Sequence, residues 1–123
     1  MVAALPCDVR RVRPRLLALP GASDRVKDFV RDVNRRAPLL GHRAVQFTVL
    51  REDVRTEIQI MTSLQHAWDR RNHCFYEWLR EGNGGEATLD LRIDDHAVAE
   101  ALHVADQMAD HNFASFLTMR GHK

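Results

Sequence analysis

The sequence predicts an α+β fold: a small mixed or antiparallel sheet flanked by helices, with a long helix at the C-terminal end. Apolar residues alternate over 44–50 and 54–61, which predicts two strands. Apolar residues recur at three- and four-residue steps over 64–79 and 95–119, which predicts two helices. A chain of 123 residues that is 45% hydrophobic is large enough to bury one core, so we expect a single domain over 1–123.

The residues before these elements give weaker signals. Four arginines are mixed with apolar residues over 8–20, where Pro14 interrupts the pattern, so a poorly defined strand or turn is predicted there. Ser23 fits the start of a short helix over 24–32. That helix is supported by apolar residues at helical spacing, namely Val26, Phe29, Val30 and Val33.

The two predicted strands are close enough to form an antiparallel hairpin. They are joined across Arg51-Glu52-Asp53, and a short connection of this kind favours direct pairing. Successive side chains of a strand point to opposite faces, so Ile58 and Ile60 should face the core. Glu57, Gln59 and Met61 should then lie together on the opposite face.

Helix boundaries can be placed from capping residues. Thr62 or Ser63 is a suitable cap for the helix that follows the hairpin, and glycines at 82, 84 and 85 should end it. Residues 88–93 alternate well enough to predict a short strand. Asp94 or Asp95 can then cap the last helix, whose wide apolar stripe suits packing on a sheet or against a second subunit.

Composition restricts the cellular setting and the partners. Two unpatterned cysteines, and a start without the charges or apolar length of a signal peptide, predict a reduced, cytoplasmic location. No apolar run approaches the ~18 residues that cross a bilayer, so membrane insertion is not expected.

Charge is unevenly distributed along the chain. Residues 1–51 hold 11 Lys and Arg against 4 Asp and Glu, while 52–123 hold 7 against 13. Either an anionic ligand on the basic half or pairing of the two halves explains this asymmetry.

Two motifs lie close together in the middle of the chain. Residues 56–68 read Thr-Glu-Ile-Gln-Ile-Met-Thr-Ser-Leu-Gln-His-Ala-Trp, and 41–49 read Gly-His-Arg-Ala-Val-Gln-Phe-Thr-Val. They resemble the V-E-I-Q-I-R-T, L-Q-H-A-W and G-Y-R-A-V-H patterns of the RelA/SpoT synthetase domain, whose members make the alarmones ppGpp and pppGpp. The resemblance covers about residues 33–79, and it implies part of a nucleotidyltransferase-like domain.

The resemblance implies a reaction and a central residue. Members of the family transfer pyrophosphate from ATP to the 3′-hydroxyl of GDP or GTP with Mg²⁺. Glu57 matches the family's catalytic glutamate, and a carboxylate on a rigid strand suits a magnesium ligand or a group that accepts the hydroxyl proton. Gln59, on the same strand face, could donate to a ribose or phosphate oxygen. The plain alternatives are a solvated glutamate and a surface amide.

Further nucleotide-binding residues are expected around Gly41. His42 occupies the position of a family tyrosine that stacks on guanine, and an imidazole offers less stacking area. Arg36 and Arg43 could contact phosphates, because guanidinium forks match phosphate oxygens, although a surface charge is the favoured alternative for each one individually. Two other motif positions differ from the family, with Gln46 in place of a histidine and Met61 in place of an arginine.

About 40 residues precede Gly41, whereas full synthetase domains carry a further helix and strand there, with basic residues for ATP and an aspartate for the metal. The sequence therefore predicts a truncated or degenerate synthetase that retains the acceptor-nucleotide half of the site, and whether it is active alone stays open. The alternatives are a noncatalytic nucleotide-binding or oligomerisation module, which would form homo-oligomers, and a protein that places pyrophosphate on an adenine nucleotide or on tRNA.

Overall fold

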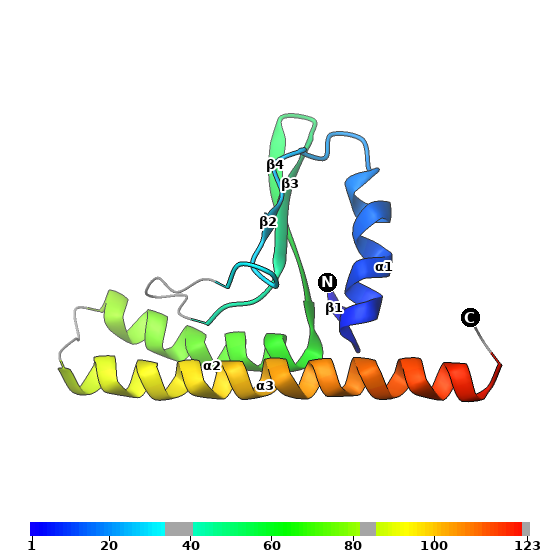
Figure 1. Ribbon diagram of the computed structural model, residues 1–123. Helices are drawn as coiled ribbons and strands as arrows, with labels where there is room; N and C mark the ends of the chain where they lie inside the picture. The colour runs from blue at the N-terminus through cyan, green and yellow to red at the C-terminus, as the bar shows by residue number, and fades with distance from the viewer. Residues whose placement is uncertain (34–40, 82–85, 122–123) are drawn as a thin grey trace.

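A computed structural model gives the fold of the protein. It describes residues 1–33, 41–81 and 86–121, with the side chains of 75–76, 78–80 and 86–95 outside that description. The architecture is α+β, with a four-stranded mixed sheet in the order β1-β4-β3-β2 and three helices (Figure 1). In chain order the elements are β1 (Val2–Ala3), α1 (Pro6–Leu17), β2 (Lys27–Asp28), β3 (Val45–Arg51), β4 (Val54–Thr62), α2 (Ser63–Arg80) and α3 (Glu86–Met119).

The predicted hairpin is confirmed. Strands β3 and β4 pair antiparallel, with Arg51 opposite Val54 and Thr48 opposite Glu57. The two residues between the strands, Glu52 and Asp53, have φ of 50° and 63°. Positive φ at both central positions is the geometry of a tight hairpin turn whose twist matches that of the strands. The register therefore places alternate β4 side chains on opposite faces, as the sequence predicts.

The predicted strand or turn over 8–20 is wrong, because most of this segment is helix α1. Pro6 at the first helical position needs no N–H partner, and the Asp8 carboxylate accepts the Leu5 N–H at 3.2 Å, so the helix starts well. Pro14 lies inside the helix without ending it. The apolar residues that pack on the sheet, Val9, Leu16 and Leu17, are spaced by seven and eight and share one side of the helix.

The predicted helix over 24–32 is also wrong. Lys27 and Asp28 form β2, which pairs antiparallel with Val45 and Gln46 of β3. The Asp28 carboxylate accepts the N–H groups of Val30 and Arg31, both at 3.1 Å. A side chain that bonds to backbone N–H groups two and three residues on favours a turn over continued helix.

The helix after the hairpin is confirmed as α2, and Thr62 is its cap: the hydroxyl accepts the Gln65 N–H at 3.2 Å. The predicted strand over 88–93 is wrong, since these residues belong to α3, which also contains the predicted helix over 95–119. Apolar and polar residues alternate over 88–93, but so short a run is compatible with the repeat of a helix as well as with that of a strand. The glycines expected to end α2, at 82, 84 and 85, lie outside the described residues.

One face of the sheet is covered and the other is open. Helix α1 stands against one face, and the antiparallel pair of α2 and α3 runs beneath the ends of the strands (Figure 1). Ile58 and Ile60 point to the α1 side, where the core also contains Val9, Val45, Phe47 and Val49. No helix among the described elements covers the other face (Figure 1). In the described part of the chain, no helix has the length and apolar character needed to span a bilayer.

Candidate functional site

The open face of the hairpin carries the predicted catalytic residue. Glu57 is exposed on β4, and its Oε1 accepts a hydrogen bond of 2.7 Å from the Gln59 amide nitrogen. Both side chains border a shallow depression of about 300 Å³, together with Met1, Val2, Met61 and His66. The strand therefore presents a carboxylate and an amide side by side to solvent, where a ligand can reach both.

Glu57 can supply only part of the coordination that a divalent ion needs. Among the described residues, no three His, Cys, Asp or Glu side chains gather in a way that could hold a metal. Mg²⁺ is commonly bound through one or two carboxylates, with substrate phosphates and water completing its coordination. One exposed carboxylate fits that requirement if a nucleotide brings the remaining oxygens. Buried Met61, at 6% exposure, adds no charged ligand at the end of the strand.

His42 lies at the base of this face but is not free for stacking. Its side chain is buried, and its Nδ1 lies 2.8 Å from Asp69 Oδ1. The amide nitrogen of Gln46 lies 3.2 Å from Nε2, so both ring nitrogens have a polar neighbour. The ring also packs edge-on against Phe29. Stacking on a base would require His42 to leave all three contacts.

Arg43 lies away from Glu57. Its guanidinium is buried and donates to the Val30 carbonyl at 2.8 Å and to Glu100 at 2.9 Å. Burial opposes the ionisation of Glu100, but the hydrogen bond and charge of Arg43 outweigh it and lower the pKa of Glu100. Arg43 therefore ties the start of β3 to α3. The predicted phosphate contact at Arg36 lies outside the described residues.

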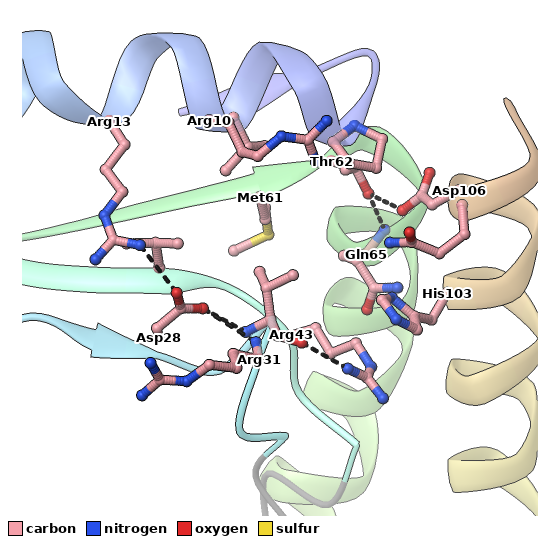
Figure 2. A pocket seen from close by; sticks show the side chains of 15 residues that line it. Arg10, Arg13, Asp28, Arg31, Arg43, Met61, Thr62, Gln65, His103 and Asp106 are labelled. Atoms are coloured by element: carbon pink, nitrogen blue, oxygen red, sulfur yellow. Dashed lines mark hydrogen bonds and ion pairs between the residues drawn. The ribbon is translucent and has the colours of Figure 1, made fainter. Parts of the chain in front are cut away.

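A deeper cavity of about 360 Å³ lies on the other side of the sheet, between α1, the β2 turn and the α2–α3 pair (Figure 2). Arg13 and Asp28 form an ion pair of 2.9 Å at one side of it. Thr62, Gln65, His103 and Asp106 lie at the other side, with Met61 between the two groups (Figure 2). The Asp28 side chain is thus half-buried in an ion pair, in the segment 24–32 for which the sequence predicts a helix.

Comparison with solved structures relates this geometry to known proteins. Small alarmone synthetase 1 from Bacillus subtilis, bound to its product pppGpp, superposes with a TM-score of 0.74 at 18% identity, over 95% of this chain and 60% of that one. Small alarmone synthetase 2 from the same organism gives 0.70 at 19% identity, over 94% and 63%. The chain has the fold of the small alarmone synthetases.

A third alarmone-synthetase-like structure extends the comparison. A GTP pyrophosphokinase family protein from Streptococcus pneumoniae gives a TM-score of 0.71 at 18% identity, over 98% of this chain and 64% of that one. The chain thus spans about 60% of the length of the synthetases that share its fold. By sequence, neither a family model nor a curated protein matches it.

Sequence reasoning brought Glu57 and Gln59 together, but it missed the residues around the deeper cavity. Gln65 belongs to the Leu-Gln-His-Ala-Trp motif, yet the helical stripe drew attention to its apolar neighbours Leu64 and Trp68. Asp106 is a buried acidic residue on the side of α3 that packs against the rest of the chain, in line with the buried Ala99. For Gln65 and Asp106, the available signal was a polar residue within the apolar repeat of a predicted helix.

Proposed function

We propose that the chain carries the acceptor-nucleotide half of an alarmone synthetase site and supports transfer of pyrophosphate from ATP to the 3′-hydroxyl of GDP or GTP. The observation that carries the proposal is the position of Glu57, an exposed carboxylate beside Gln59 on a rigid hairpin. The fold around it is shared with small alarmone synthetase 1, whose structure contains its product pppGpp. The protein is expected to act in the cytoplasm.

In this reaction the ribose 3′-oxygen forms a bond to the β-phosphorus of ATP, the bond from that phosphorus to the α–β bridging oxygen breaks, and AMP leaves. Glu57 would orient the 3′-hydroxyl and accept its proton. Mg²⁺, when bound, would offset charge on the phosphates, with Glu57 as its protein ligand. Gln59 would donate to a ribose or phosphate oxygen and hold the Glu57 carboxylate in place, as its 2.7 Å hydrogen bond already does.

A second function is a noncatalytic nucleotide-binding module. It is favoured by the surroundings of Glu57, where Met61 adds no phosphate donor and His42 is engaged with Asp69. Such a module would bind GDP or GTP without turnover. It would also self-associate through α3, whose solvated side exposes large apolar residues, namely Val104, Met108, Phe113 and Phe116.

The test is separation of labelled products after incubation with ATP, Mg²⁺ and GDP, GTP, an adenine nucleotide or tRNA as acceptor. Glu57→Gln should lower product formation by about a hundredfold or more, the scale of a lost general base. Glu52→Gln, in the exposed turn of the same hairpin, is the matched control and should leave turnover unchanged. Equal turnover in both variants would contradict the role of Glu57. Calorimetric binding of GDP or GTP without product would establish the second function.

A further inference from the structure

The deeper cavity contains polar groups that have no partner. Gln65 is 3% exposed, and neither its Oε1 nor its Nε2 has a hydrogen-bond partner. Arg43 is 7% exposed, and its Nε is likewise without a partner. Both side chains line the same cavity. Leaving buried donors and acceptors unpaired costs free energy, so nearly all such groups in folded proteins bond to protein, water or a ligand.

Two titratable groups, Asp106 and His103, lie near the Gln65 carboxamide (Figure 2). Burial raises the pKa of Asp106, against the hydrogen bond from Thr62, and burial together with the charge of Arg43 lowers the pKa of His103. The two titratable groups near the carboxamide are therefore both biased toward their neutral forms. Apolar side chains complete the walls, namely Pro6, Val9, Val45 and Met61.

Apart from Arg43, the arginines that line the cavity are already paired with carboxylates. Arg10 donates to Asp110 at 2.7 Å and Arg13 to Asp28 at 2.9 Å. A phosphate held only by these guanidiniums would have to share them with carboxylates. The unpaired hydrogen-bonding capacity of the cavity is therefore concentrated at Gln65 and Arg43.

A carboxamide presents one acceptor and two donors in a plane, and it pairs in bidentate fashion with a planar ring that carries a donor beside an acceptor, as it does with adenine. A volume of about 360 Å³ lies at the lower end of the ~300–1,000 Å³ typical of small-molecule sites. We propose that this cavity binds a nucleobase or nucleoside through the paired hydrogen bonds of the Gln65 carboxamide.

This site is distinct from the one proposed around Glu57. The cavity is lined by Val9 and Val45, which belong to the α1 side of the sheet, whereas Glu57 and Gln59 lie on the open face. The proposal goes beyond the proposed function and holds whether or not the chain transfers pyrophosphate. A ligand here would touch α1, the β2 turn, α2 and α3 together, so its binding would stabilise their packing.

The experiment is calorimetric titration of the whole chain with adenosine, guanosine, cytidine and uridine, and with their 5′-monophosphates. Saturable binding of at least one nucleoside at one site per chain is expected. Gln65→Met keeps a side chain of similar length and removes the hydrogen bonds, so it should weaken binding by about tenfold or more. Glu52→Gln, in the exposed turn of the hairpin and in the lining of neither site, is the matched control and should bind like the wild type.

A second variant guards against a change in folding at position 65. Gln107 is exposed and lines the same cavity, so Gln107→Trp should narrow its entrance without disturbing the core, and nucleoside binding should again fall. Circular dichroism checks the fold of each variant. Absence of saturable binding, equal affinity in Gln65→Met, or competition by inorganic phosphate alone would overturn the proposal and leave a cavity that holds water or an anion.

Discussion

The Thr62 hydroxyl donates a buried hydrogen bond of 2.6 Å to the Asp106 carboxylate and at the same time accepts the Gln65 N–H. One side chain thus ends β4, caps α2 and fixes the position of α3. Both residues are buried, so water cannot replace the bond when it is lost. The Thr62 hydroxyl therefore joins β4, α2 and α3 at the junction between the sheet and the helical pair.

Replacing this hydroxyl should destabilise the fold. Thr62→Val keeps the shape of the side chain but removes the cap and leaves Asp106 without its donor. Loss of a cap costs about 1 kcal/mol and an unpaired buried polar group about 1–3, so the free energy of unfolding should fall by roughly 2–4 kcal/mol. Urea denaturation measures this. Ser63→Ala, at the exposed next residue, should change stability by less than about 0.5 kcal/mol.

Asp106 should make the fold less stable as the pH rises. Burial raises its pKa above the ordinary 3.8, against the hydrogen bond from Thr62, so the folded chain binds the proton more tightly than the unfolded chain. The free energy of unfolding then falls from pH 3.8 upward until the pKa of the folded state is passed. Asp106→Asn should remove this decrease. Parallel pH profiles of wild type and variant between about pH 4 and pH 7 would contradict the assignment.

Asp110 acts in the opposite direction. Burial opposes its ionisation, but hydrogen bonds from Arg10 and the Cys7 N–H outweigh this and lower its pKa. Its stabilising contribution is present above pH 3.8 and is lost as the pH falls through the lowered pKa. Asp110→Ala should lower the free energy of unfolding by about 1–2 kcal/mol at neutral pH, because the first turn of α1 loses an N–H acceptor. Asp32→Ala, at an exposed pair, is the control.

Gly41 should tolerate no side chain. Its φ is +87°, and an added Cβ would lie 2.9 Å from His96 Nδ1 and 3.0 Å from the Ala99 Cβ. Gly41→Ala should therefore cost about 2 kcal/mol or more, of which about 1–2 is the left-handed backbone and the rest is displacement of α3. Gly121 has a φ of +78° with open space around it, so Gly121→Ala should show the backbone part alone. Equal thermal shifts for the two variants would contradict the steric account.

Replacing Arg43 should lower the free energy of unfolding more than replacing its partner Glu100. Arg43→Met removes the donor to Glu100 and to the Val30 carbonyl, and we expect a loss of roughly 2–3 kcal/mol. That is below the ~3–5 kcal/mol of a fully buried pair because the Glu100 side chain is 40% exposed. Glu100→Gln keeps an acceptor oxygen for Arg43 and should cost under about 1 kcal/mol. Chemical denaturation of both variants distinguishes the two effects.

Local patterns predicted the parts of the fold that local chemistry controls. Alternation fixed the hairpin and the opposite faces of Ile60 and Glu57, and the capping chemistry of Thr62 located the start of α2. The same reasoning fails for α1, because Pro14 interrupts the sequence pattern, whereas the helix continues through this residue in the structure. It fails for β2, because the partners of β2 in β3 lie 17 and 19 positions further along the chain, which helical spacing over 24–32 cannot reveal.

The sequence by itself determined the hairpin, the carboxylate–amide pair on its open face and the resemblance to alarmone synthetases, because strand alternation and short motifs are local properties. Only the tertiary structure decided that His42 is engaged with Asp69, that Arg43 supports α3, and that Gln65 is buried at a cavity without a partner. Burial and pairing depend on which distant elements meet. That packing involves all three helices and the sheet, so no single segment encodes it.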